Sequence, residues 1–400
     1  LVGSDMCIRD RSSIFRILVK SNPDFQKILL DLAKDIDTVN LSKETLDKIY
    51  GDKLYASVSS FERFYNCEYQ YFLETTLGLE TFENIDINSK IVGNFFHEVF
   101  EKVMQEEALS AENFDEKLTK VLHDVDSNYS RYFTQDATAR FTWTNLEEIV
   151  RQTATVLKET VSTDELKTLL TESSFGLPKS ELGNFSVDDI YLRGRIDRLD
   201  QLSSDYLGAI DYKSSAHSFK LQDAYDGLSL QFMTYLDVIK EAFPNQKIWG
   251  ALYLQFKNQP INLSEINHLS EIAGLLKESM RYDGLVLEEA ADQIKAIENI
   301  TVKKSNIYNQ EEFEQLLKLN ENHYQHAGQR LKSGQIAINP IMKRSEGIDQ
   351  TGNVRGCRYC PLKSICRFEA NVHMNEHSRE IGQKSQAEIL AELKGEGRNE

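Results

Sequence analysis

Two carboxylates and a lysine stand near the middle of the chain, at the ends of two apolar runs typical of β-strands. Asp197 ends the first run, and Asp211 with Lys213 ends the second. Side chains alternate between the two faces of a strand, so Asp211 and Lys213 share a face. The turn-like residues 201–205 lie between the runs. If they form a hairpin loop centred on their middle residue, Asp197 lies opposite Ala209 and diagonal to Asp211, on that same face.

The chemistry of this carboxylate–lysine group is that of a divalent-metal site. Two carboxylates so close repel one another unless a cation lies between them, and hard oxygen ligands favour Mg²⁺ or Mn²⁺. A lysine beside such a metal can orient a water or stabilise the charge that grows on an attacked phosphate. A surface hairpin with scattered charges would also fit these residues. The metal interpretation therefore depends on support from elsewhere in the chain.

A histidine and a glutamine–tyrosine pair provide part of that support. Apolar residues recur at helical spacing over residues 92–103, and His97 lies at the edge of this apolar stripe. Gln231 and Tyr235 are four residues apart in a second helical pattern, so they point the same way, and this common direction allows both to face the strand patch. A histidine satisfied within the core, a helix N-cap or ordinary helix packing would also explain these residues.

Four cysteines have the spacing of a metal or cluster site. Cys357, Cys360 and Cys366 form a Cys-x2-Cys-x5-Cys triplet, and Cys67 lies 290 residues before it. Four thiolates suit zinc or an iron–sulfur cluster, but structural zinc sites usually come as two close pairs. The spacing favours a metal or cluster over inert buried thiols. Three basic residues near the triplet would offset the negative charge of a thiolate-bound cluster: Arg358, Lys363 and Arg367.

Taken in order along residues 54–370, these motifs resemble the RecB-type PD-(D/E)XK nucleases. Within that group the resemblance is greatest to the C-terminal nuclease domain of the B subunit of bacterial AddAB/RexAB helicase–nucleases, in the RexB branch. Glu68 departs from the family, which often has a proline after the first cysteine. The resemblance is carried by Gly93-x3-His97, Gly194-Arg195-Ile196-Asp197-Arg198, Asp211-Tyr212-Lys213, Gln231-x3-Tyr235, the Ser57–Phe64 run and the four cysteines.

The resemblance implies a fold and a catalytic site. The fold would be an α/β, restriction-endonuclease-like core, with a mixed sheet flanked by helices, helical insertions and an iron–sulfur staple. Lys213 would assist at the phosphate, and Gln231 with Tyr235 would position the nucleic acid or the lysine. The implied ligands of Mg²⁺ or Mn²⁺ are His97, Asp197, Asp211 and the backbone carbonyl of Tyr212. The implied catalytic residues are Asp197, Asp211, Lys213, Gln231 and Tyr235.

The same resemblance implies one [4Fe–4S] cluster with a structural role. It would join the two ends of the nuclease domain and close a loop of about 300 residues. A link of this length reduces the conformational entropy of the unfolded chain. This raises the free energy of the unfolded chain by roughly 5 kcal/mol if estimates for disulfides apply. The implied cluster ligands are Cys67, Cys357, Cys360 and Cys366.

The function implied is that of a metal-dependent DNA exonuclease domain in an ATP-dependent helicase–nuclease. A partner A subunit would unwind broken duplex ends, and this domain would trim the 5′-ended single strand, leaving a 3′ overhang for recombinational repair. The chain has no Gly-x4-Gly-Lys-Ser/Thr phosphate loop, so it has no recognisable ATP site. The resemblance implies that the partner A subunit hydrolyses ATP.

Two other interpretations stay open. One is a stand-alone iron–sulfur nuclease like the CRISPR-associated Cas4 group, which shares the cysteine layout. The chain is long for that group, and a helical run of about 70 residues after His97 argues against it. The other is a non-catalytic DNA-binding scaffold module. The intact set of two aspartates and a lysine argues against a scaffold, which needs none of the three.

Composition bounds the interpretation without deciding it. The chain has 40% hydrophobic and 27% charged residues and a net charge of −17 at pH 7. A negative net charge is unexpected for a DNA enzyme. Net charge governs only long-range steering, however, and the candidate site itself is locally basic because basic residues gather around the motifs. No run approaches 18 apolar residues and no secretory signal opens the chain. Together with cysteines kept as thiolates, this predicts a cytoplasmic protein without membrane contact.

Four segments are expected along the chain. Residues 1–12 resemble the in-frame translation of a transposase adapter used in sequencing libraries, so we treat them as non-native and leave Cys7 out of the ligand count. Residues 13–53 are expected to be a helical junction to a missing helicase-like region. Residues 54–370 are expected to form the nuclease domain, and residues 371–400 a polar helical tail.

Within the nuclease domain the apolar pattern predicts a β-hairpin, followed by a helix that crosses over to a third strand. A strand–helix–strand succession implies parallel pairing of its two strands. The expected elements are helices over 91–170, strands near 188–200 and 206–213, a helix near 222–243, a strand at 248–256 and helices over 263–335.

Overall fold

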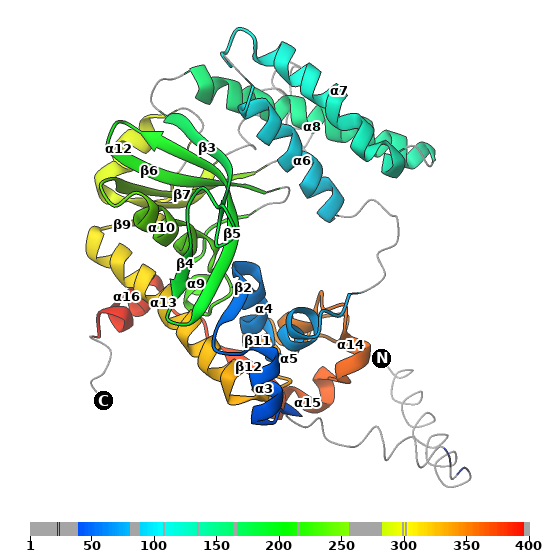
Figure 1. Ribbon diagram of the computed structural model, residues 1–400. Helices are drawn as coiled ribbons and strands as arrows, with labels where there is room; N and C mark the ends of the chain where they lie inside the picture. Colours follow the sequence, from blue (N-terminus) through cyan, green and yellow to red (C-terminus); the bar gives the residue numbers. More distant parts are fainter. Residues whose placement is uncertain are drawn as a thin grey trace, which may run out of the picture.

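A mixed eight-stranded sheet forms the centre of the computed structural model of this protein (Figure 1). The structure describes residues 22, 24, 39–80, 89–106, 109–133, 136–162, 166–213, 217–255, 282–297, 300 and 302–395. The strands of the sheet are β2 (Leu54–Ser57), β3 (Leu166–Phe175), β4 (Phe185–Val187), β5 (Ile190–Leu202), β6 (Tyr206–Lys213), β7 (Lys247–Gln255), β8 (Tyr282–Leu287) and β9 (Ile307–Tyr308).

The order of the strands is β2-β5-β6-β7-β8-β9, and β3 and β4 also pair with β5. The strands β5 and β6 form an antiparallel hairpin, whereas β6 and β7 are parallel, as the sequence pattern predicted. A helix crosses over between β6 and β7, which is how two parallel neighbours are usually connected. Residues Leu207 to Tyr212 of β6 are all buried, because helices cover both faces of the sheet at this strand.

Helices on the two faces enclose two separate apolar cores. Leu207 and Ala209 of β6 face the first core, and Ile210 and Tyr212 face the second. The helices of the first core are α4 (Val58–Asn66), α9 (Leu221–Tyr225), α10 (Gln231–Ala242), α13 (Gln310–Ser333) and α16 (Gln386–Lys394). Those of the second core are α6 (Ser89–Met104), α7 (Phe114–Phe133), α8 (Ala137–Ser162) and α12 (Glu288–Ala296).

Smaller elements bring the two ends of the domain together. The Asn66 side chain at the end of α4 donates a 2.9 Å hydrogen bond to the Gly356 carbonyl, 290 residues later. The remaining described elements are β1 (Val39–Asn40), α3 (Lys43–Ile49), α5 (Glu68–Tyr71), η1 (Phe72–Thr76), η3 (Lys304–Asn306), β10 (Gln335–Ile336), β11 (Ile341–Lys343), η4 (Arg355–Cys357), α14 (Lys363–Cys366), α15 (Ala370–His377) and β12 (Arg379–Ile381).

Two stretches expected to be helical contain strands instead. The predicted helical run 91–170 ends before β3, and the predicted run 263–335 contains β8. All six residues of β8 are buried, and a short apolar run of this kind cannot be told from a buried helix by its periodicity. The strand β3 pairs with β5 over most of its length, a long-range contact that has no local signal.

The C-terminal segment is more than a polar helical tail. It contains β12, which pairs in parallel with β11, and α16, whose Ile389 is buried in the first core. Residues 1–12 and nearly all of the stretch before residue 39 lie outside the described residues. Among the described helices, none combines the length and the apolar character needed to cross a membrane.

Candidate active site

The β5–β6 hairpin places the two predicted carboxylates side by side, but in a different register from the predicted one. Leu199, and not Asp197, pairs with Ala209. The turn comprises residues 203–205. It is centred on residue 204 and not on residue 203, so the partner of each β5 residue moves by two positions. Because two residues are one full period of a strand, Asp197 keeps its face and comes level with Asp211. Its Oδ2 accepts a 2.7 Å hydrogen bond from the Tyr212 backbone N–H.

Asp211, Lys213 and Gln231 form a continuous polar group in which Lys213 contacts both partners. Lys213 Nζ lies 2.6 Å from Asp211 Oδ2 and donates to Gln231 Oε1 at 3.2 Å. The Gln231 amide in turn donates to Asp211 Oδ1 at 2.6 Å. Asp211 is 1% exposed, whereas Lys213 is 23% exposed, so only the lysine of this ion pair reaches the surface. The lysine is therefore the member of this ion pair that can meet a substrate.

Tyr235 links the Gln231 side chain to the backbone of β5. Its hydroxyl accepts a 2.6 Å hydrogen bond from the Gln231 amide and donates to the Arg195 carbonyl at 2.7 Å. Tyr235 is 4% exposed. The structure thus places Tyr235 against Gln231 and the β5 backbone, where it holds the glutamine in place.

Glu62, which the sequence analysis did not single out, fixes the start of the same helix. The N-cap residue of α10 makes no side-chain capping hydrogen bond. Instead, Glu62 of α4 accepts hydrogen bonds from the backbone N–H groups of Leu230 at 2.8 Å and Gln231 at 3.3 Å. Burial raises the pKa of Glu62, while these two hydrogen bonds and Lys213 oppose the rise. Its only sequence signal was its place in the family-like run before Cys67.

A group of candidate metal ligands, the metal-ligand group, forms where α6 approaches the hairpin. His97 Nδ1 lies 3.4 Å from Asp197 Oδ2 and 3.7 Å from Glu172 Oε1. One ligand atom from each of these three residues lies within 4.8 Å of the others. His97 is one-third exposed, and the neighbouring apolar residues of α6 are buried, as the helical stripe predicted. Glu172 comes from β3, a strand that the sequence did not predict.

The acid–base properties of the group fit a bound cation. Burial, and after it the charge of Asp211, raises the pKa of Asp197 well above its usual range. Burial opposes protonation of His97, but the carboxylates of Glu172, Asp197 and Asp211 outweigh it and raise the histidine pKa. A divalent cation would remove the mutual repulsion of these carboxylates and hold them ionised.

An orphaned oxygen provides a second test of whether a metal fits. Glu172 Oε1 is buried and accepts no hydrogen bond within the described part of the chain. A buried carboxylate oxygen normally accepts a hydrogen bond, and here the ion-pair partner, His97 Nδ1, lies 3.7 Å away. With one imidazole and a nearby set of carboxylates, the donors are those that Mg²⁺ and Mn²⁺ accept.

A buried ion pair on the opposite face stiffens the strand that carries Asp197. Arg198 and Asp200 are both fully buried, and their charged groups lie 2.8 Å apart. Arg198 also donates to the hydroxyls of Tyr212 and Tyr282, each at 3.4 Å. Removing one partner of a buried ion pair leaves an uncompensated charge, so this pair resists rearrangement of the strands beside the site.

The four predicted cysteines surround one small pocket. Cys67, Cys357, Cys360 and Cys366 all line it and none forms a disulfide. Burial raises the pKa of Cys67 to about 11 and that of Cys357 to about 12. Thiols in so apolar a setting stay protonated unless a metal binds the thiolate, so this donor set fits a metal or an iron–sulfur cluster.

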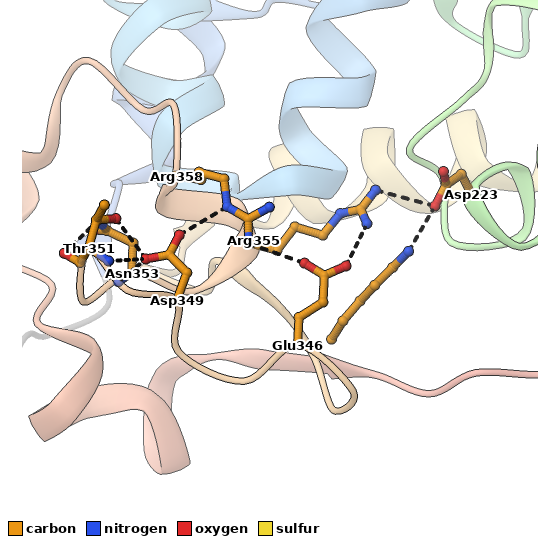
Figure 2. Close-up of polar contacts among 8 residues, drawn as sticks. Asp223, Glu346, Asp349, Thr351, Asn353, Arg355 and Arg358 are labelled. Atoms are coloured by element: carbon orange, nitrogen blue, oxygen red, sulfur yellow. Dashed lines mark hydrogen bonds and ion pairs between the residues drawn. The ribbon is translucent and has the colours of Figure 1, made fainter. Parts of the chain in front are cut away.

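One basic residue predicted to balance the cluster charge is paired elsewhere. Arg358 Nε donates to Asp349 at 3.0 Å, and a second guanidinium nitrogen donates to Glu346 at 3.3 Å (Figure 2). Arg355 links the same Glu346 to Asp223 of α9. These ion pairs tie the cysteine segment to the core. Lys363, by contrast, lowers the pKa of Cys357, as a cation near the thiol should.

Glu68 has a structural explanation at the position where the family often has proline. Its carboxylate lies 2.9 Å from Arg330 of α13, and its backbone N–H donates to the Asn339 side chain at 2.9 Å. A proline would lack that N–H. In this chain the turn after Cys67 is therefore held by contacts with α13 and with the segment that precedes the cysteine triplet.

The fold and the site together define a PD-(D/E)XK nuclease. A model of the PD-(D/E)XK nuclease superfamily matches residues 55–367, and the chain belongs to this superfamily. This confirms the predicted α/β core with a mixed sheet flanked by helices.

The relatives are components of helicase–nucleases, which confirms the second part of the resemblance. The chain is 99% identical to the B subunit of the ATP-dependent helicase/deoxyribonuclease of Lactococcus lactis subsp. lactis, over 97% of the chain and 35% of that protein. It is 90% identical to the exonuclease/helicase subunit RexB of Lactococcus lactis subsp. cremoris, over 100% of the chain and 37% of the relative.

A more distant relative is the helicase/deoxyribonuclease B subunit of Streptococcus agalactiae serotype Ia. It is 33% identical over 86% of the chain and 30% of the relative. The chain thus spans about a third of the length of the curated relatives that it matches.

Proposed function

We propose that the chain is the DNA-cleaving part of a helicase–nuclease B subunit and hydrolyses phosphodiesters with Mg²⁺ or Mn²⁺. The observation that carries this proposal is the convergence of His97, Glu172 and Asp197 within 4.8 Å, beside the Asp211–Lys213 ion pair. Membership of the nuclease superfamily supports it. A scaffold protein would gain nothing from so many buried ionisable groups at one point.

Each side chain has a role in this proposal. A divalent cation held by His97, Asp197, Asp211 and the Tyr212 carbonyl, with Glu172 as an added ligand, would polarise the phosphodiester and lower the pKa of a water. Lys213 keeps its positive charge at the surface of the site, because Asp211 and Asp197 outweigh the effect of burial and raise its pKa. Gln231 orients the lysine, and Tyr235 orients Gln231.

The wider setting of the reaction follows from the names of the relatives. One is called the B subunit of an ATP-dependent helicase/deoxyribonuclease, and another an exonuclease/helicase subunit. We infer a partner A subunit that supplies ATP-driven unwinding and single-stranded DNA ends. The chain would then resect the 5′-ended strand at double-strand breaks for recombinational repair. Its thiolate cysteines suit the reducing cytoplasm.

The four cysteines are proposed to bind one [4Fe–4S] cluster that holds the ends of the nuclease domain together. Support comes from their common pocket and from the absence of disulfides among them. Cys67 follows α4, and the triplet belongs to the segment that Asn66 contacts. A group bound by all four thiolates would therefore link the entrance and the exit of the domain.

The test is cleavage of labelled single-stranded DNA by the anaerobically purified chain with Mg²⁺, Mn²⁺ or EDTA. Asp211→Asn keeps the size of the side chain but removes its charge, and we expect it to lower the rate by several orders of magnitude. The control is Asp205→Asn, an exposed residue in the turn of the same hairpin.

The outcomes separate the alternatives. Wild-type cleavage that needs a metal and is lost in Asp211→Asn alone supports the proposal. DNA binding by the wild type without cleavage in either metal, with or without a helicase partner, would favour a scaffold. Full activity that no partner increases would favour a stand-alone nuclease.

A further inference from the structure

The first half of β5 presents a row of side chains outside both apolar cores. Ile190 and Leu192 are buried, whereas Tyr191 is half-buried and Arg193 and Arg195 are exposed. The three outward residues alternate with the buried ones, as they must on a strand with one covered face. At about 3.3 Å per residue, the row from Tyr191 to Arg195 is about 13 Å long.

The neighbouring edge strand extends the row with a second tyrosine. Tyr55 of β2 pairs in register with Tyr191, and their rings stack with centroids 5.2 Å apart. Tyr55 is 63% exposed, although large aromatic side chains usually bury most of their surface. Lys53 Nζ lies 4.7 Å from the centre of the Tyr191 ring. Stacking between neighbouring strands would by itself explain the Tyr55–Tyr191 pair. It does not explain why the Tyr55 ring is so exposed.

The row leads to the metal-ligand group. Arg195 Nη1 lies 3.3 Å from Glu172 Oε2, and Glu172 lies beside His97. The backbone carbonyl of Arg195 accepts the hydrogen bond from Tyr235. A strand of nucleic acid lying along the row would therefore reach the site without crossing either core.

The charge of the row contrasts with that of the whole chain. Lys53, Arg193 and Arg195 line it in a chain of net charge −17. Within the described residues Arg193 forms no ion pair, whereas nearby Asp189 is neutralised by Lys332. Cations next to exposed aromatic rings are the combination with which proteins bind single-stranded nucleic acid, through phosphate contacts and base stacking.

We propose that Lys53, Tyr55, Tyr191, Arg193 and Arg195, the tyrosine–arginine row, bind single-stranded DNA and guide it to the metal-ligand group. Bases stack on the tyrosine pair, and the arginines contact successive phosphates. The inference rests on the proposed nuclease function, because it assigns the path by which that site receives its substrate.

The test is the affinity of the chain for fluorescent oligo(dT), measured by anisotropy in EDTA so that no cleavage occurs. Tyr55→Leu keeps apolar contact with Tyr191 but removes the aromatic face, and we expect it to raise Kd about tenfold, with Tyr55→Phe near the wild type. Arg193→Gln should raise Kd and reduce the slope of log K against log salt by about 0.7.

Matched controls come from two exposed residues of α8. Arg140→Gln and Phe141→Ala remove the same kinds of group from another surface, and both should leave Kd unchanged. Circular dichroism and thermal unfolding establish that each variant is folded. If the row variants bind like the wild type, or if the α8 variants lose affinity equally, the proposal is overturned.

A small substrate separates this proposal from the proposed function. Hydrolysis of bis(p-nitrophenyl) phosphate with Mn²⁺ needs the metal site but no extended strand. Tyr55→Leu and Arg193→Gln should leave this hydrolysis unchanged while weakening DNA binding. A different result is that the wild type hydrolyses neither substrate, while the row variants bind DNA more weakly than the wild type. That result would reject the nuclease function and keep the row as a DNA-binding surface.

Discussion

Lys213 Nζ lies 2.6 Å from Asp211 Oδ2, two residues away on the same face of β6. The aspartate is almost completely buried, and the lysine carries the positive charge of the pair to the surface. This arrangement separates two tasks, because the carboxylate can bind a metal while the ammonium group meets the substrate.

Lys213→Ala is expected to lower the rate of DNA cleavage by a factor on the order of 10², the usual effect of losing one charged stabiliser of a transition state. The midpoint of the Mn²⁺ dependence should change little, since the lysine is no metal ligand. Single-turnover cleavage and calorimetric Mn²⁺ titration measure the two effects. Lys213→Arg, which keeps the charge, should retain part of the activity. An unchanged rate in Lys213→Ala would remove the lysine from the chemistry.

Glu172→Gln is expected to weaken metal binding about tenfold or more while the chain stays folded. Its carboxylate lies among the donors around His97 and has a buried oxygen without a hydrogen bond in the described residues. Calorimetric titration with Mn²⁺ reports the affinity directly. Glu181→Gln, an exposed residue near the end of β3, is the control. Equal Mn²⁺ affinity in wild type and Glu172→Gln would exclude Glu172 as a ligand.

Cys67→Ser is expected to lose the cluster and to destabilise both ends of the domain together, because cluster binding is coupled to folding. Iron, sulfide and zinc analysis of anaerobically purified protein gives the metal content, and limited proteolysis reports the loosened ends. Cys7→Ser should behave like the wild type. A colourless wild-type protein with one equivalent of zinc and no iron would refute the cluster but leave a metal link between the ends in place.

Stability is expected to fall on acidification below about pH 6.5 because of His323 of α13. Burial lowers the pKa of this histidine to about 4. Between pH 6.5 and 4 the unfolded chain therefore binds a proton that the folded chain does not, so the free energy of unfolding decreases as the pH falls. The contribution is at most about 3 kcal/mol over this range.

His323→Gln isolates this contribution from the titration of other groups. Glutamine retains a donor for the Ala224 carbonyl, which lies 3.1 Å from the histidine Nε2. Urea unfolding between about pH 4.5 and 7 should show a weaker pH dependence in this variant than in the wild type. Parallel curves for the two proteins would contradict the expected role of His323.

The sequence by itself predicted the family of this protein and part of its candidate site. The order of the motifs predicted the nuclease family, and strand alternation placed Asp211 and Lys213 on one face, as their ion pair confirms. The strand–helix–strand pattern predicted the parallel pairing of β6 and β7. Local periodicity suffices for such features, because the residues involved lie within one or two adjacent elements.

Only the tertiary structure decided which distant side chains complete the site. Glu172 comes from β3 and Glu62 from α4, and each meets the site through contacts with residues far away in sequence. The hairpin register also escaped prediction, because the turn-like residues 201–205 fit a loop centred on residue 203 as well as one centred on residue 204. Side chains that packing brings together leave no pattern in the sequence around each of them. Their contacts, and the burial that shifts their pKa, arise only when the elements assemble.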